Sequence, residues 1–243
     1  ALGHHGVLLF RGLHLEPEAQ LAFARRLGEI DLDATGDPLP GIMRVTLDRE
    51  KSVSAPYFKG TFFWHIDGTT PPDDACPQKA TILTAIAVAD SGGETEFASS
   101  YAAYEHLSEQ DKARVDGLRV VCTLEASQRL AFPNASDKVV ASWRLRKTSE
   151  HPLVWTHRDG RKSLVLGAST DHLVGMDPDE SRALLDALLD QATTPDRVYR
   201  HSWEPGDTVM WDNRGVLHRA VPYPTDSPRD MLRTTILGDE PIE

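Results

Sequence analysis

The last third of the chain restricts its fold more than any other part. Four short apolar segments are predicted to be strands, at 198–201, 208–211, 216–221 and 231–237. Turn sequences separate them, Pro205-Gly206-Asp207 and Asp212-Asn213-Arg214-Gly215 among them. A meander of short strands with few helices argues for a β-sandwich or jelly roll that carries its helices on the outside.

The remainder of the chain adds elements of the same kind. Strands are predicted at 7–10, 42–47, 79–88, 120–124 and 163–166, and helices at 17–27, 101–107, 109–116 and 178–192. Leu21, Phe23, Ala24 and Leu27 are expected to form the buried face of the first helix. The stretch 126–151 shows no clear period and is expected to be a long ordered loop or lid. The predicted fold class is α+β, mainly β.

One domain is expected over 1–243, because the sequence has no repeat, no linker and no change in composition. The first residue is not methionine, and 6–10 already has the pattern of a core strand. An N-terminal lead is therefore expected to be missing from the sequence.

Charge and cysteine content narrow the classes of function. The formal net charge of -11 disfavours binding to nucleic acid or to anionic membranes, both of which need a positive field. No apolar run approaches the length of a membrane span. Only two cysteines occur, Cys76 and Cys122, so a disulfide framework is not indicated and a cytoplasmic location is expected. A small-molecule substrate fits this composition better than a macromolecular one.

Three residues could hold a metal ion. His65 and Asp67 are two positions apart, so on an extended strand both side chains point to the same face. The pair follows Phe62-Phe63-Trp64 and is expected at the end of an apolar strand. A His-x-Asp pair alone occurs by chance in many proteins. His218, however, lies on a return strand, and a jelly roll can bring this strand to face His65 and Asp67. Two histidines and one carboxylate mark non-haem Fe(II) oxygenases, whereas a structural zinc site needs four protein ligands.

Two arginines follow the second histidine. If the segment 229–237 is extended, Arg229 and Arg233 are four residues apart and share one face, which is expected to be the face that carries the His218 site. They could be solvated strand residues. On an inward face, however, two guanidinium groups are unfavourable unless they bind anions.

These motifs together resemble the taurine dioxygenase / 2,4-dichlorophenoxyacetate dioxygenase family of Fe(II)- and 2-oxoglutarate-dependent oxygenases. The resemblance extends from about residue 6 to the end of the chain, in the family's order. The matching segments are Trp64-His65-Ile66-Asp67, Gly92-Gly93-Glu94-Thr95, His151-Pro152-Leu153-Val154 with Thr156-His157, Gly206 to Arg214, His218-Arg219-Ala220-Val221, and Arg229 to Leu237. The fold that it implies is a double-stranded β-helix, a form of jelly roll with flanking helices.

The resemblance also implies roles for single residues. His65, Asp67 and His218 match the Fe(II) ligands, and Arg229 and Thr95 match the residues that hold the far carboxylate of 2-oxoglutarate. With O2, such an enzyme hydroxylates its substrate and releases succinate and CO2. Arg233 matches a position near the anionic group of the substrate in several members. A halogenase is argued against, because Asp67 is present where that chemistry requires the carboxylate to be replaced.

The substrate is left open among an aryloxyalkanoate, an alkyl sulfate or sulfonate, and another small carboxylate. Taurine users carry a His-rich stretch after the first helix and an Asn before the first ligand, where this chain has Ile30-Asp31-Leu32-Asp33 and Thr61. Residues expected to line the pocket, or else to pack in the core, are Tyr57, Thr61, Phe62, Ile66 and the loop 126–147.

Two alternatives remain at this stage. One is a non-catalytic, cupin-like binding protein of the same fold, and the other is an oxygenase of this fold that acts on a different class of substrate. The resemblance also implies a homo-oligomer, because members of the family are dimers or tetramers more often than monomers.

Overall fold

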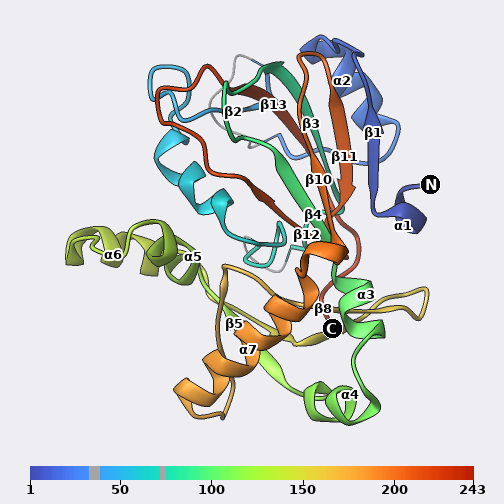
Figure 1. Cartoon of the computed structure of the whole chain (residues 1–243), viewed down its shortest axis with the longest axis vertical. Helices are drawn as coiled ribbons and strands as arrows, with labels where there is room; N and C mark the ends of the chain where they lie inside the picture. The colour runs from blue at the N-terminus through green and yellow to red at the C-terminus, as the bar shows by residue number, and fades with distance from the viewer. Residues whose placement is uncertain (33–38, 72–74) are drawn as a thin grey trace.

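Two antiparallel sheets that face each other form the centre of the structure, a computed structural model that describes residues 1–32, 39–71 and 75–243 (Figure 1). The larger sheet has the order β1 (Val7–Phe10), β11 (Thr208–Asp212), β3 (Ala80–Ala87), β13 (Asp230–Ile236) and β2 (Met43–Val45). The smaller sheet has the order β10 (Val198–His201), β4 (Thr95–Ser99) and β12 (Val216–Ala220). The predicted jelly roll with outer helices is confirmed.

Apolar side chains from both sheets fill the space between them. Leu83 and Met231 of the larger sheet pack in one buried cluster with Phe97 and Val216 of the smaller sheet. Because successive strand residues point to opposite faces, each strand also supplies the outer face, where the helices pack.

Helix α2 (Pro17–Arg25) covers the outer face of the larger sheet. Gln20, Leu21 and Ala24 are its buried residues. The expectation that Phe23 and Leu27 are buried is wrong, since they are 37% and 40% exposed. The helix turns 20, 21 and 24 towards the sheet, and Leu27 lies beyond its last turn.

Most of the remaining helices and strands pack below the two sheets in Figure 1. The strands form a sheet of β6 (Ser149–Pro152), β5 (Arg119–Cys122) and β9 (Thr170–Leu173) and a hairpin of β7 (Val154–Thr156) and β8 (Lys162–Leu164). The helices of this part are α3 (Ser100–Glu105), α4 (Glu109–Val115), α7 (Pro178–Ala192) and the short η2 (Pro195–Arg197). The short helix α1 (Leu2–His5) instead lies beside β1 and β11 of the larger sheet. Ser108 caps α4 and Asp177 caps α7, as expected from sequence.

The expectation of a loop over 126–151 is wrong. Two helices occupy most of it, α5 (Leu124–Ala131) and α6 (Asp137–Arg144), and α6 extends away from the body (Figure 1). Each helix is too short for its apolar period to stand out. Glu125 of α5 joins the two helices by an ion pair with Arg144 of α6, and it also pairs with Arg129 within α5.

The segment before the metal residues also differs from its prediction. Residues 55–62 form a 3-10 helix, η1 (Ala55–Phe62), rather than an apolar strand. Strand β4, which carries Thr95, was not predicted, because Gly92-Gly93-Glu94 reads as a turn with no apolar alternation. Asp33, named in the comparison with taurine users, lies outside the described residues.

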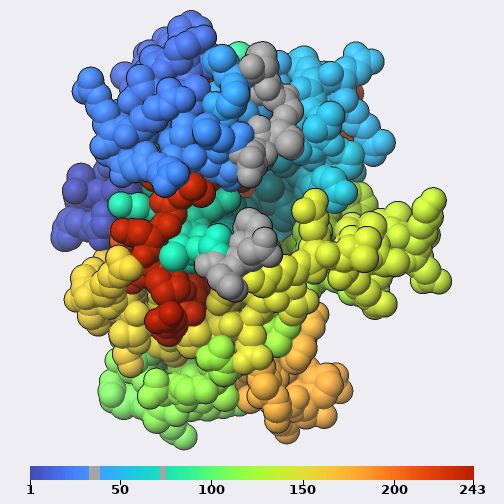
Figure 2. All heavy atoms as spheres, turned by 180° about the vertical axis from the view of Figure 1, so that it is seen from behind, coloured from blue at the N-terminus to red at the C-terminus, as the bar shows by residue number. Residues whose placement is uncertain are grey.

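The end of the chain runs across the back of the molecule beside the β7–β8 hairpin (Figure 2, red beside yellow). Glu240 accepts a hydrogen bond from the backbone N–H of Arg158 at 2.8 Å and lies 3.7 Å from Arg214. No helix in the described ranges is long and apolar enough to cross a membrane.

Candidate active site

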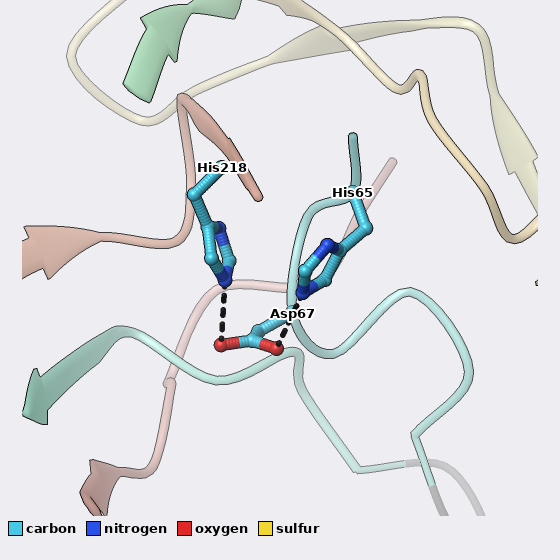
Figure 3. A group of neighbouring side chains, drawn as sticks. All are labelled: His65, Asp67 and His218. Carbon is cyan, nitrogen blue, oxygen red and sulfur yellow. Dashed lines mark ion pairs between the residues drawn. The ribbon is translucent and has the colours of Figure 1, made fainter. Parts of the chain in front are cut away.

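His65 and His218 face each other across a two-residue backbone bridge. His65 N–H donates to the carbonyl of His218 at 3.0 Å, and His218 N–H donates back at 2.9 Å. Strand β12 supplies His218, and the segment after η1 supplies His65. The ring centroids are 4.1 Å apart, and both rings point towards Asp67 (Figure 3). The predicted pair and the predicted distant histidine thus come together, through a short bridge rather than a long strand.

The His65 ring presents a lone pair to the site. Its Nδ1 lies 2.8 Å from the carbonyl of Phe63, which can only accept, so Nδ1 carries the proton. Burial, followed by the nearby His218, lowers the pKa of His65 to about 4. At neutral pH the ring is therefore neutral, and its Nε2 is free to bind a metal ion.

The His218 ring packs against two aromatic rings. Its centroid lies 4.7 Å from that of Trp211 and 6.4 Å from that of Phe97. Its Nδ1 is buried and has no partner within the part of the chain that the structure describes. Its Nε2 lies 3.5 Å from Asp67 Oδ2, on the side of the other two candidate ligands.

Asp67 is fixed as a carboxylate by its neighbours. Oδ2 accepts hydrogen bonds from Arg233 Nη2 at 2.8 Å and Thr81 Oγ1 at 3.1 Å. Burial alone would raise the pKa of Asp67, but Arg233 and then His218 outweigh it and hold this pKa well below its usual value. Thr81 in turn accepts from Asn213 Nδ2 at 3.0 Å. The relay from Asn213 through Thr81 orients the carboxylate, and Oδ1 faces His65 Nε2 at 3.8 Å.

The three residues fit an Fe(II) ion. One ligand atom from each lies within 4.8 Å of the others, and no fourth His, Cys, Asp or Glu joins the group within the described ranges. Three protein ligands with open positions match a catalytic non-haem iron site and not a closed structural zinc site.

Gly167 supports the His65 backbone and gives a direct test of the site. It has a φ of +113, and a Cβ atom there would lie 2.6 Å from the Trp64 carbonyl oxygen and 2.8 Å from His65 Cα. We expect Gly167→Ala to displace His65 and to weaken Fe(II) binding about 10-fold or more, the size of effect seen when contacts that orient a metal ligand are lost. Anaerobic titration with Fe(II), with the melting temperature recorded at each Fe(II) concentration, measures this affinity.

Gly160→Ala is the matched control for that experiment. Gly160 also has a positive φ, +84, but an added Cβ would meet nothing within 4 Å. Both variants carry backbone strain, whereas only Gly167→Ala presses on His65. Equal Fe(II) affinity in the two variants would contradict the role given to Gly167.

A pocket joins the metal residues to the predicted cosubstrate residues. Its cavity volume is about 50 Å³. Its polar lining comes from Thr61, His65, Thr95, His218, Arg219, Arg229 and Arg233, and its apolar lining includes Val45, Phe58 and Leu83. Ile66 is not among the lining residues, since it packs in the hydrophobic core. Tyr57 lines a different pocket, with Phe132 and Trp143.

Arg229 is a buried cation at this pocket. It is 3% exposed, its Nε donates to the carbonyl of Gly93 at 3.2 Å, and its guanidinium carbon lies 5.0 Å from the centre of the Tyr223 ring. Burial lowers the pKa of Arg229, yet an arginine keeps its charge in proteins. Within the described residues no carboxylate pairs with it. A buried, unpaired charge of this kind indicates a site for an anion.

Arg233 stands at the metal end of the pocket. Its Nη2 contacts Asp67 and also Gln78 Oε1, at 3.0 Å. Its Nε is buried without a partner among the described residues. Arg233 also lines the pocket that contains His65 and Arg229.

Sequence reasoning missed the residues that orient the site. Thr81 and Asn213 form the relay to Asp67, Tyr223 lies beneath Arg229, and Gly167 packs on His65. A polar residue within a buried strand was a usable signal for Thr81. The other three depend on contacts between distant segments and carry no local signal.

Comparison with known proteins agrees with this geometry. The family model described as "Taurine catabolism dioxygenase TauD, TfdA family" matches residues 1–235. A (S)-phenoxypropionate/alpha-ketoglutarate-dioxygenase of Sphingobium herbicidovorans is 38% identical over 98% of this chain and 84% of its own length. An alpha-ketoglutarate-dependent sulfate ester dioxygenase of Pseudomonas putida is 32% identical over 100% of this chain and 80% of its own.

A solved structure shares the fold as well. The crystal structure of AAD-2 in complex with Mn(II) and N-oxalylglycine superposes with a TM-score of 0.82 and 34% sequence identity, over 98% of this chain and 85% of that one. The family model, the relatives and the solved structure all point to the same family. The chain belongs to the TauD/TfdA family and is a 2-oxoglutarate-dependent non-haem iron dioxygenase.

Proposed function

We propose that His65, Asp67 and His218 are the Fe(II) ligands and that Arg229 and Thr95 hold the far carboxylate of 2-oxoglutarate. The observation that carries this proposal is one pocket with a neutral imidazole lone pair at one end and a buried, unpaired guanidinium at the other. The keto acid group of 2-oxoglutarate suits the end with the metal ligands, and its far carboxylate suits the end with the guanidinium. Arg233 is assigned to the anionic group of the primary substrate, with Thr61 on the pocket wall. Ile66 supports its neighbours from the core.

Bound Fe(II) supplies the redox chemistry that couples oxidation of 2-oxoglutarate to succinate and CO2 with hydroxylation of the substrate by O2. The residues of this chain position the reactants. Arg229 and Thr95 hold the cosubstrate at the end away from the metal, which fixes its orientation before reaction. The Thr81 and Arg233 contacts keep the Asp67 carboxylate charged and aligned. No side chain needs to act as a general base in this scheme.

The substrate that we propose is an aryloxyalkanoate. Arg233 lines the pocket with a positive charge that suits a carboxylate, and the relative with 38% identity is named for a phenoxypropionate. An alkyl sulfate is the second candidate, because a relative with 32% identity is named for sulfate esters and the same guanidinium binds either anion.

Release of succinate decides between these substrates. Purified enzyme with Fe(II), 2-oxoglutarate and O2 should release succinate fastest with one enantiomer of a 2-phenoxypropionate, and more slowly with alkyl sulfates, alkylsulfonates and taurine. The same amounts of protein without a primary substrate give the background. Faster release with an alkyl sulfate would support the second candidate, and background rates throughout would contradict both.

We also propose that the protein forms a homo-oligomer and is located in the cytoplasm. A dimer or tetramer is supported by helix α6, which extends from the body, and by Leu145 at its end, which is 86% exposed. Light scattering from the purified protein tests this. A cytoplasmic location is supported by the two cysteines, both of which are free thiols.

A further inference from the structure

Trp203 touches the proposed cosubstrate site through a single hydrogen bond. Its indole N–H donates to Thr95 Oγ1 at 2.9 Å. Thr95 is buried at the start of β4 and lines the pocket that contains Arg229. Trp203 follows the end of β10 and lines a separate pocket on the other side of Arg229. The indole therefore approaches Thr95 from outside the cosubstrate pocket.

This contact determines where the Thr95 hydroxyl proton can go. A threonine hydroxyl has one proton and two acceptor positions, whereas an indole N–H can only donate. Trp203 therefore occupies an acceptor position of Thr95 and leaves its proton free. Within the described residues Thr95 Oγ1 has no other hydrogen-bond partner, and the arginines that line the pocket cannot accept a hydrogen bond. The hydroxyl needs an acceptor from outside the protein, and an anionic oxygen satisfies it.

Trp203 is itself held in place by a buried frame. Its ring meets the His201 ring edge to face at 4.5 Å, and His201 is the cross-strand neighbour of Thr95. His201 Nε2 lies 3.3 Å from Asp207 Oδ2, and Asp207 forms an ion pair with Arg11 at 2.7 Å. The same carboxylate accepts the backbone N–H of Glu204, next to Trp203, at 3.0 Å. The indole is therefore fixed from two directions.

We infer that Trp203 is a positioning residue for 2-oxoglutarate: its indole N–H turns the Thr95 hydroxyl into a dedicated donor to the far carboxylate. The inference rests on the proposed placement of that carboxylate between Thr95 and Arg229. A hydrogen-bonded chain of this kind also polarises the hydroxyl, which strengthens its bond to an anion. Trp203 touches no reactant and acts only through Thr95.

A double-mutant cycle on 2-oxoglutarate binding tests this. The dissociation constant is measured anaerobically on the Fe(II)-loaded enzyme, from the visible absorption band that 2-oxoglutarate produces. Thr95→Val should raise it about 10-fold or more, as expected for a lost hydrogen bond to a charged group, and Trp203→Phe about 3- to 10-fold. In the double variant Trp203→Phe should add nothing to the effect of Thr95→Val.

A second ligand and a control variant separate positioning from general damage. 2-Oxopentanoate lacks the far carboxylate, so its affinity should be the same in all variants. Trp155→Phe is the matched control, because Trp155 is buried in a different cluster and its indole N–H has no partner among the described residues. It should leave 2-oxoglutarate binding unchanged even if it lowers the melting temperature.

The outcomes distinguish the inference from the proposal beneath it. If Thr95→Val binds 2-oxoglutarate normally, the placement of the carboxylate is wrong and the inference fails with it. If Thr95→Val weakens binding but Trp203→Phe does not, only the inference fails. It also fails if the two effects multiply in the double variant, or if 2-oxopentanoate binding falls in parallel, since either result would mean that Trp203 acts by packing.

Discussion

Replacing Arg229 by Gln should raise the 2-oxoglutarate concentration needed for half-maximal succinate release about 100-fold, with Fe(II) affinity nearly unchanged. Removing one partner of a buried charge pair weakens binding by about 2–5 kcal/mol, and about 1.4 kcal/mol corresponds to tenfold. Arg229 is the buried guanidinium that lines the pocket and has no ion-pair partner in the described part of the chain, so Gln leaves the far carboxylate with Thr95 alone. Steady-state kinetics over a range of 2-oxoglutarate measures the shift.

Arg161→Gln is a suitable control for Arg229→Gln. Arg161 also lies over a tyrosine ring, with its guanidinium carbon 3.7 Å from the centre of Tyr101, but it lines a pocket away from the metal. Arg161→Gln should leave the 2-oxoglutarate concentration for half-maximal succinate release unchanged. If this concentration is also unchanged in Arg229→Gln, the assignment of Arg229 to the cosubstrate is refuted.

Replacing Asp67 by Asn should lower Fe(II) affinity more than about 100-fold and abolish succinate release. Loss of contacts that merely orient a ligand lowers metal affinity by about 10- to 100-fold, so loss of the charged ligand should exceed that range. Asn has the shape of Asp and can still accept from Thr81, which favours a folded variant. Metal content after anaerobic loading and desalting gives the result.

Glu240→Gln is the control for the loss of charge. Glu240 is a buried carboxylate beside a histidine, 3.4 Å from His157 Nδ1, and lies outside the metal group. It should retain full Fe(II) loading. An Asp67→Asn protein that loads as well as this control would show that Asp67 does not bind the metal.

Local sequence patterns predicted those parts of the fold that are set by neighbouring residues. Helix α7 was predicted because Asp177 and Pro178 mark its start and its leucines repeat at helical spacing. Strands β10 to β13 were predicted from apolar runs bounded by turns. By contrast, α5 and α6 were not recognised, because two turns of helix carry too few apolar residues for a period.

The candidate site was predictable in composition and not in arrangement. The spacing of His65 and Asp67 and the resemblance to a known family named the residues that now share one pocket or cluster. Neither could show that Arg233 pairs with Asp67, or that Thr81 and Asn213 align it, because these contacts join segments far apart in the chain. They depend on the register in which β3 pairs with β11 and β13.

The most direct test of the iron and 2-oxoglutarate site is anaerobic absorption spectroscopy of the purified protein. Fe(II) and 2-oxoglutarate added together should produce a weak visible charge-transfer band, which neither produces alone and which Asp67→Asn fails to develop. The melting temperature should rise with both ligands, because a ligand that binds only the folded state stabilises it. No band and no change in melting temperature with the unaltered protein would contradict the site described for His65, Asp67, His218 and Arg229.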